Sequence, residues 1–233
     1  MKTIDLYAES WEFYKAHTEA FIDDIQFYRD FCGNKKSLEL FAGYGRVANR
    51  LISMGVDLET VELSANFAKQ IALPSTRNHV ADVLAFDPKR KFDRVYAAYN
   101  SFCLLTTDTA IDRFFKNLRG WLTDNGVACL SYYGVEFWKD AVPGEFDFGG
   151  RKIKYVPKWD LGQRGQGLGT WIDEYHDQGR IVTHRYDVRL HEDPKALDSL
   201  LRSSGLRLTS VTKDFNQAQV SEPGWVDYIV QPL

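Results

Sequence analysis

The chain alternates short apolar runs with segments in which apolar residues recur every three or four positions. Apolar runs bounded by glycine or polar residues are typical of buried strands, and the longer period is typical of amphipathic helices. We expect strands at 37–41, 58–63, 78–83, 92–98 and 127–133. We expect helices between them at 46–54, 65–71 and 109–121. This alternation predicts a parallel sheet with right-handed crossovers.

The segments on either side of this alternation have a different pattern. The N-terminal segment is unusually aromatic and predicts two helices, at 9–17 and 22–31. After residue 133 we expect strands without helices between them, at 151–157, 168–176 and 180–190. Strands that lack crossover helices cannot extend a parallel sheet, so they predict a separate antiparallel layer. A helix opened by Asp193-Pro194 and two strands, at 206–213 and 225–230, complete the pattern.

The stretch Leu38–Arg46 carries the most information about a ligand. It reads as a strand that breaks into a turn with Gly43 and Gly45 and then opens a helix. Glu62 lies 17 residues after Gly45, at the end of the second predicted strand. Glycines in such a turn let the backbone approach a ligand closely, and an acid at the next strand end accepts hydrogen bonds from ribose hydroxyls. The glycine turn and Glu62 together predict an adenosine-containing cofactor.

The turn departs from the G-x-G-x-x-G pattern of nicotinamide and flavin sites. That pattern tolerates Ala48 at its third position but not Phe41 at its first. What remains, Glu39 followed by Ala42-Gly43-Tyr44-Gly45, resembles motif I of the class I S-adenosylmethionine (SAM)-dependent methyltransferases, whose first glycine is often replaced. Phe41 is the clear departure from that motif.

Two further segments carry the resemblance, which covers nearly the whole chain. Phe92–Phe102 is similar to the family's FD–apolar strand–NS signature, and Leu122–Gly126 occupies the slot of its L-x-P-G-G turn. The resemblance implies an α/β fold: a Rossmann-like, mostly parallel, seven-stranded sheet with an N-terminal helical lid and an antiparallel β insert. It divides one domain, 1–233, into a lid (1–33), a SAM-binding core (36–133), a β insert (134–192) and a final helix and strand pair (193–233).

The resemblance also implies the cofactor site for SAM, with S-adenosylhomocysteine as product. Glu62 would hold the ribose, and Asp82 would contact the adenine amino group. The residues that would surround the methionine end or line the rest of the pocket are Tyr14, Glu39, Ala42, Gly43, Gly45, Leu63, Val83 and Ala98. A charged Glu39 within an apolar strand costs free energy unless an opposite charge lies nearby. The sulfonium cation of SAM would be a suitable partner for it.

Three of these residues have a plainer alternative. Glu62 could be a surface acid favoured by the dipole of the following helix. Asp82 could cap the turn that follows it, and Tyr14 could simply pack its helix.

The acceptor is expected to be a small molecule methylated on nitrogen or oxygen. The tip of the fourth strand, Ala98-Tyr99-Asn100-Ser101, lacks the prolines of the N/D-P-P-Y/F tetrad found in enzymes that methylate base amines or glutamine. The net charge of −3 gives no electrostatic footprint for nucleic acid. Methyl transfer needs alignment of the acceptor above all, and a general base only if the acceptor is protonated.

Candidate acceptor residues come from the strand tip, the lid and the insert. Tyr99 and Asn100 end a strand, where such sheets bind ligands. His184 lies on the apolar face of its predicted strand and is a candidate base or orienting group, with a satisfied core histidine as the alternative. Tyr14 and Asn100 are further catalytic candidates, and His17 is a weaker alternative base. Trp171 shares a face with Tyr175 and Asp173, an arrangement that would suit an amine.

Composition limits the environment and the partners. No run approaches the about 18 apolar residues of a membrane span, and no signal-peptide pattern is present. Three cysteines show neither pairing nor metal spacing, and no acid–histidine cluster predicts a metal. We therefore expect a soluble, cytoplasmic protein without nucleic-acid or membrane partners. The insert either roofs the acceptor site or joins two copies into a homodimer through an edge strand.

Three other functions fit the same general pattern less well. A nicotinamide-dependent oxidoreductase is disfavoured by Phe41 and by the lack of a suitably placed Tyr-x-x-x-Lys pair. Aminopropyl transfer from decarboxylated SAM needs an acidic pocket, which Ala98-Tyr99 does not supply. A non-catalytic protein that binds an adenosine ligand remains open, because lost activity can leave the fold intact.

Overall fold

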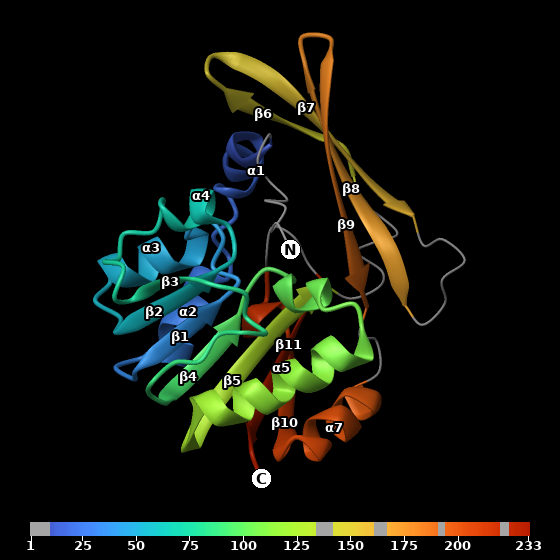
Figure 1. The fold of residues 1–233 in the computed structure, drawn as a ribbon. Coiled ribbons are helices and arrows are strands. Elements are labelled where there is room, and N and C mark those ends of the chain that lie inside the picture. The colour runs from blue at the N-terminus through green and yellow to red at the C-terminus, as the bar shows by residue number, and fades with distance from the viewer. Residues whose placement is uncertain (1–9, 134–141, 161–166, 191–193, 220–223) are drawn as a thin grey trace.

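The computed structural model describes residues 10–133, 142–160, 167–190, 194–219 and 224–233. Its body is a seven-stranded sheet in the order β10-β11-β5-β4-β1-β2-β3, and the remaining strands form a four-stranded sheet beyond the carboxyl ends of the parallel strands (Figure 1). The strands of the large sheet are β1 (Ser37–Leu40), β2 (Leu58–Glu62), β3 (Asn78–Val80), β4 (Phe92–Ala97), β5 (Leu122–Tyr133), β10 (Leu206–Lys213) and β11 (Trp225–Pro232).

The direction of the strands matches the predicted mixed α/β architecture. β1 is central and pairs in parallel with β2 and β4, while β4 pairs in parallel with β5. β11 runs antiparallel to both of its neighbours, β5 and β10. The large sheet is therefore mostly parallel, as the sequence predicts.

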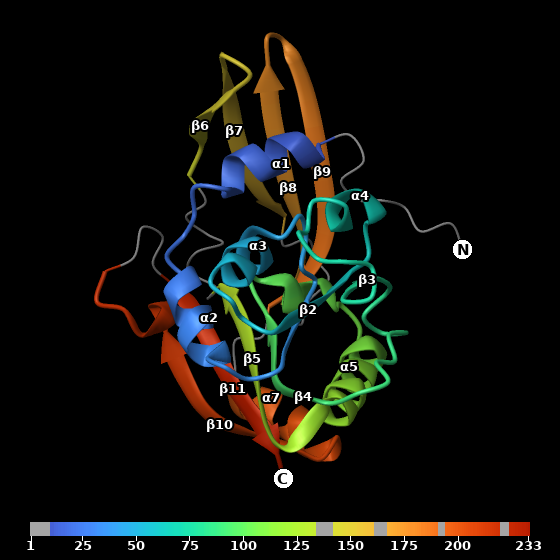
Figure 2. The same ribbon diagram turned by 90° about the vertical axis from the view of Figure 1, so that its left-hand side faces the viewer.

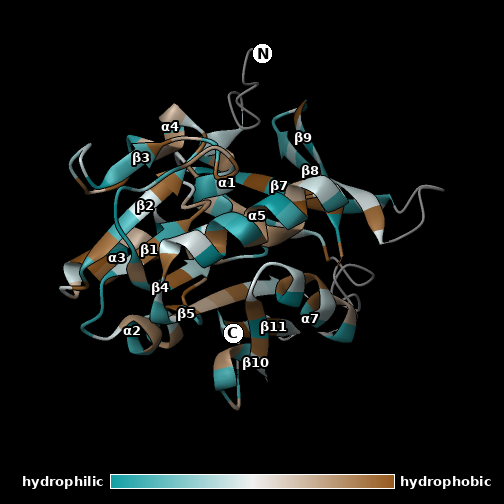
Figure 3. Ribbon diagram, turned by 60° about the horizontal axis from the view of Figure 1, so that its bottom comes forward, coloured by the Kyte–Doolittle hydropathy of each residue, from teal (hydrophilic) through white to brown (hydrophobic). Residues whose placement is uncertain are grey.

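Helices cover both faces of the large sheet, with α5 and α7 on one side and α2 and α3 on the other (Figures 1 and 2). They are α1 (Trp11–Thr18), α2 (Ile25–Cys32), α3 (Arg46–Ser53), α4 (Ala65–Ala68), α5 (Asp108–Trp121) and α7 (Pro194–Ser203), with 3₁₀ turns η1 (Ser101–Leu104) and η2 (Asp214–Asn216). Figure 3 shows hydrophobic residues concentrated on the strands between these layers.

The alternation of side chains along the strands assigns each residue to one layer. Leu38 and Leu40 pack into the core with Phe114 of α5. Tyr96 faces α2, where its ring stacks on Tyr28 with centroids 4.6 Å apart. Glu39 lies opposite Tyr96 in the parallel register and therefore faces the same layer.

The β insert contains one strand more than the sequence predicts. Its order is β6 (Gly144–Phe148), β7 (Arg151–Asp160), β8 (Leu168–Asp177) and β9 (Arg180–Arg189), all antiparallel. β6 joins β7 through a Gly149-Gly150 turn. Only Phe146 and Phe148 of its five residues are half-buried, against the small core of the insert, so its apolar pattern is short.

The lid and the insert pack against each other. α1 lies across one face of the four-stranded sheet (Figure 2). The Phe13 ring lies 4.9 Å from the ring of Phe148, and His17 lies 3.8 Å from Tyr155, both measured between centroids. The N-terminal helix therefore connects the insert to the core instead of covering the core alone.

Some predicted boundaries shift where side chains bond to the backbone. The third strand ends at Val80 instead of 83, since Asp82 Oδ1 accepts a hydrogen bond from the Leu84 amide at 2.8 Å and turns the chain. The fifth strand already begins at Leu122, with a register shift in its pairing to β4. None of the helices in the described ranges is long and apolar enough to cross a membrane.

Candidate cofactor and acceptor site

The turn after β1 keeps its left-handed backbone despite Phe41. Phe41 has φ 54°, Gly43 φ 57° and Gly45 φ 84°. A Cβ on Gly45 would lie 2.9 Å from the side-chain Nδ2 of Asn49, whereas a Cβ on Gly43 would meet nothing within 4 Å. Phe41 thus adopts the conformation that glycine supplies easily, and its ring lies 6.3 Å from Phe114. The departure from motif I does not open the turn.

Glu62 ties the first two strand tips together. The Gly43 amide donates to its Oε2 at 2.7 Å, and the Ser64 amide donates to its Oε1 at 2.7 Å. The side chain is buried at the carboxyl end of β2. The interpretation of Glu62 as a surface acid is therefore wrong, because its carboxylate points into the motif I turn.

The neighbours of Glu62 differ in exposure. Leu63, which follows it, is 45% exposed although it is a large apolar side chain. Val83 and Ala98 are buried, and Asp82 is exposed while capping its own turn. The capping interpretation of Asp82 is thus confirmed, and its contact with adenine stays a prediction.

Glu39 is a buried acid with one neutral partner. The Tyr96 hydroxyl donates to its Oε2 at 3.0 Å, and the residue is 2% exposed. Burial raises the pKa of Glu39 from 4.5 to about 8, an effect that the hydrogen bond from Tyr96 only partly offsets. The carboxyl is therefore largely protonated at neutral pH unless a cation lies beside it.

The raised pKa of Glu39 predicts a pH-dependent stability. An acid whose pKa is higher in the folded state stabilises the fold below pH 4.5, and this contribution is lost as the pH rises to about 8. We expect Glu39→Gln to leave the free energy of unfolding unchanged near pH 4.5 and to raise it at pH 8 by up to about 5 kcal/mol. Urea unfolding at both pH values measures this.

Glu59 supplies the matched control for that experiment. It is equally buried in β2, but it is hydrogen-bonded to His79 at 3.0 Å and forms an ion pair with Arg90 at 2.7 Å. Glu59→Gln should therefore destabilise the protein at pH 8. A Glu39→Gln protein that is less stable than wild type at pH 8 would contradict the prediction.

A buried ion pair holds the lid to the first helix of the core. Arg46 Nη1 donates to Asp24 Oδ1 at 2.7 Å and to the Phe21 carbonyl at 2.9 Å, and Nη2 also bonds Asp24. The guanidinium lies 4.8 Å from the ring centroid of Tyr99. This pair was not predicted from the sequence. The available signal was a basic residue at the start of a helix, where the helix dipole disfavours it.

The tip of β4 is strained and closely packed. Tyr99 and Asn100 have φ 52° and 62°, which costs an ordinary side chain about 1–2 kcal/mol each. The Tyr99 ring lies 5.4 Å from Trp225, and Asn100 Oδ1 accepts a hydrogen bond from the Cys103 thiol at 2.9 Å. Such strain is typical of functional sites, because the surrounding packing must impose it.

Tyr14 belongs to the lid helix α1 and packs against the cofactor turn. The centroid of its ring lies 6.2 Å from that of Tyr44 and 5.9 Å from that of Phe67. Burial, with added repulsion from Tyr44, Asp173 and Glu62, raises the pKa of Tyr14 well above its usual range. The hydroxyl is therefore suited to donating a hydrogen bond rather than to taking up a proton.

The inner face of the insert carries a buried polar group. Trp171 Nε1 and the Tyr155 hydroxyl both donate to Asp173 Oδ1 at 2.7 Å. His184 lies directly opposite Asp173 in the β8–β9 register, and both are buried. His17 contacts the other side of Tyr155, and burial lowers the pKa of His17 to about 4, so its ring is neutral.

Solved structures resemble the chain over most of its length. The CcbJ methyltransferase from Streptomyces caelestis is 18% identical with a TM-score of 0.71, and the match covers 90% of this chain and 88% of that one. A SAM-dependent methyltransferase from Clostridium acetobutylicum is 14% identical with a TM-score of 0.72, covering 94% and 96%. The sugar N-methyltransferase KedS8 from Streptoalloteichus sp. is 19% identical with a TM-score of 0.71, covering 95% and 92%.

The chain has the Rossmann-like methyltransferase fold. No protein-family model matches the sequence, and no curated protein matches it. The methyltransferase fold explains why the predicted site residues gather in two groups. Those of the core lie at the carboxyl ends of the parallel strands, as Glu62 on β2 and Tyr99 after β4 do on either side of β1, whereas Trp171 and His184 lie on the insert.

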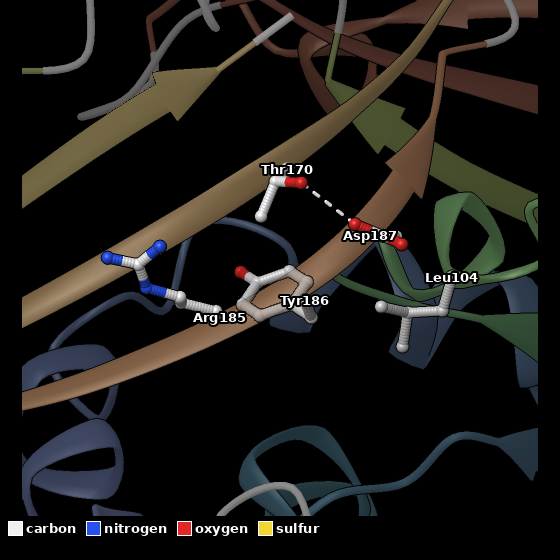
Figure 4. A pocket seen from close by; sticks show the side chains of 5 residues that line it. All are labelled: Leu104, Thr170, Arg185, Tyr186 and Asp187. Carbon is white, nitrogen blue, oxygen red and sulfur yellow. Dashed lines mark hydrogen bonds between the residues drawn. The ribbon is translucent and has the colours of Figure 1, made fainter. Parts of the chain in front are cut away.

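An open pocket of about 290 Å³ lies where the edge of β9 meets η1 (Figure 4). Its lining residues are Leu104, Thr170, Arg185, Tyr186 and Asp187. Thr170 donates to Asp187 at 2.8 Å. None of the residues predicted to bind cofactor or acceptor lines this pocket. One lining residue, Tyr186, packs against His184, with the ring centroids 5.2 Å apart. Within the described ranges, no three His, Cys, Asp or Glu side chains are placed to hold a metal ion.

Proposed function

We propose that this protein transfers a methyl group from SAM to nitrogen or oxygen of a small-molecule acceptor. The observation that carries the proposal is the Glu62 carboxylate, buried at the tip of β2 and oriented by the Gly43 amide. A ribose presents two adjacent hydroxyl donors, and a fixed carboxylate at this strand tip accepts from both. The lid, the core and the insert would enclose the reacting atoms.

The residues present fit SAM at each part of its structure. Gly43 leaves open space above the motif I turn, where a side chain would otherwise stand. The exposed Leu63 offers an apolar surface for adenine beside Asp82 and Val83. Glu39 is a buried acid that a nearby cation would ionise. Ala42, Gly45, Tyr14 and Ala98 would complete the cofactor pocket. When bound, SAM supplies an electrophilic methyl group on a sulfonium.

The comparisons support the reaction class and the kind of acceptor. KedS8 is a sugar N-methyltransferase and the Clostridium protein is SAM-dependent, and this chain shares their fold. The protein's own task in such a displacement is to align the acceptor and exclude water. Tyr14, Tyr99 and Asn100 would border the acceptor from the core, and Trp171 and His184 from the insert. We further propose that the protein acts in the cytoplasm.

Calorimetric titration with S-adenosylhomocysteine, with NADH in parallel, tests the cofactor. We expect binding of the first and none of the second. Transfer of labelled methyl groups from SAM to a panel of small acceptors then tests catalysis. Binding of NADH alone, or of neither ligand, would overturn the proposal. Binding of S-adenosylhomocysteine without transfer to any acceptor would favour a non-catalytic adenosine-binding protein.

A further inference from the structure

The Asp173 carboxylate is held in one orientation by hydrogen bonds to only one of its two oxygens. The Tyr155 hydroxyl and Trp171 Nε1 both donate to the same oxygen, Oδ1, at 2.7 Å. Oδ2 has no hydrogen-bond partner among the described residues. The residue is 3% exposed. Two donors on one oxygen fix the plane of the carboxylate, so the direction of Oδ2 is set before any ligand arrives.

Asp173 lies on the side of the insert that faces the cofactor turn. The Tyr14 hydroxyl is close enough to both Asp173 and Glu62 for each carboxylate to act on its pKa. The Tyr155 hydroxyl, which bonds Asp173, is likewise within electrostatic reach of Tyr99 at the tip of β4. Asp173 and Glu62 therefore both lie near Tyr14, which connects the insert with the cofactor turn.

A buried carboxylate in this place favours an acceptor that gains positive charge. An amine accepts the methyl group in its neutral form, after releasing its proton to solvent, and its nitrogen lone pair forms the new N–C bond. The S–C bond of SAM breaks with its electron pair left on sulfur, and the positive charge passes to nitrogen. A fixed negative charge beside that nitrogen stabilises the transition state more than the ground state. A product that stays neutral gains no such stabilisation.

We propose that the Asp173 carboxylate binds an amine acceptor through Oδ2 and stabilises the charge that develops on its nitrogen. This inference rests on the proposed methyl transfer and adds the acceptor class and its binding residue. The amine also supplies the partner that a desolvated carboxylate requires. Burial raises the pKa of Asp173 to about 6, so the carboxylate form exists at neutral pH. The rings of Tyr155 and Trp171, whose polar atoms bond Oδ1, would add apolar surface near the amine.

The test uses matched amine and hydroxyl acceptors with the full-length protein. The probes are glucosamine with glucose, benzylamine with benzyl alcohol, and cyclohexylamine with cyclohexanol, each supplied with methyl-labelled SAM. We expect label in one or more amines and in none of the alcohols. Asp173→Asn keeps an oxygen for both donors but removes the charge. We expect kcat/KM for the amine to fall about 100-fold or more, with binding of S-adenosylhomocysteine unchanged.

A pH profile separates a charged contact from a structural one. Wild-type transfer should rise through about pH 6 as Asp173 ionises, and Asp173→Asn should lack that limb. The titratable groups facing Asp173 are Tyr155 on β7, His184 on β9 and Tyr14 on α1, and all three remain in the variant. Glu174→Gln is the control, because Glu174 pairs with Lys158 at 2.6 Å on the opposite face of β8. It should behave like wild type.

The outcomes distinguish this inference from the proposed function. Label in alcohols alone, label in no amine, or equal amine transfer by wild type and Asp173→Asn would overturn the role of Asp173. If S-adenosylhomocysteine still binds in such a case, the proposal that SAM is the cofactor is unaffected. Loss of S-adenosylhomocysteine binding in the wild type would overturn the proposed function itself.

Discussion

Replacement of Glu62 by alanine is expected to remove cofactor binding. A hydrogen bond to a charged group contributes about 1.5–3 kcal/mol, so the loss of two ribose contacts lowers the affinity for S-adenosylhomocysteine by about 100-fold or more. The Gly43 and Ser64 amides also lose their acceptor, which frees the motif I turn. Isothermal titration of both proteins with S-adenosylhomocysteine measures the change.

Two further variants make the Glu62 result specific. Glu62→Gln keeps the size of the side chain and one carbonyl acceptor, so its affinity should lie between wild type and Glu62→Ala. Glu59→Ala removes an acid from the same strand whose partners are His79 and Arg90. It should lower stability while the affinity of the folded protein stays that of wild type. Undiminished affinity in Glu62→Ala would remove the main support for an adenosine ligand.

Replacement of Arg46 by alanine is expected to cause the largest loss of stability. Removal of one partner from a buried pair leaves Asp24 as an uncompensated charge, at a cost of about 3–5 kcal/mol. Tyr99 also loses the cation above its ring. For a chain of this length the midpoint of thermal unfolding should fall on the order of 10 °C. Thermal and urea unfolding, followed by circular dichroism, measure both quantities.

The neighbouring arginine provides the control for Arg46. Arg50 lies one turn later on α3 and donates to the carbonyls of Arg46 and Glu19 at 2.8 and 2.9 Å. Arg50→Ala should cost about 1 kcal/mol. The double variant Asp24→Leu/Arg46→Met leaves no charge in the site and should recover much of the lost stability. If Arg46→Ala were as stable as Arg50→Ala, the Asp24–Arg46 ion pair would not contribute substantially to the stability of the protein.

The sequence predicts the order of elements well because the buried strands carry short apolar runs that are bounded by turns and separated by helical spacing. β1 and β4 are flanked by turns and lie between two helical layers, so their pattern is unambiguous. β6 was not predicted because it is only five residues long and its apolar pattern consists of two half-buried residues, Phe146 and Phe148. The third strand was overextended because a side-chain bond from the Leu84 amide to Asp82 ends it, and apolarity alone does not reveal such a bond.

The cofactor site was also more predictable than the acceptor site. Gly43, Gly45 and Glu62 belong to one strand–turn–helix unit and its neighbour, so their spacing along the chain fixes their place in space. Asp173 and Tyr155 come from the insert, and their hydrogen bond depends on how β7 pairs with β8. The contribution of Tyr14 likewise depends on how α1 packs, which spacing does not reveal.

By itself the sequence determined the alternation of strands and helices, the glycine turn and the acid at the end of β2, because these follow from local backbone preferences and short spacing. Only the tertiary structure decided that Asp24 and Arg46 form a buried pair, that Phe41 keeps a left-handed backbone, and that Asp173 is fixed with Oδ2 left without a partner in the described residues. These features join segments that are distant in the chain. Their energies come from burial, which exists only after the layers have packed.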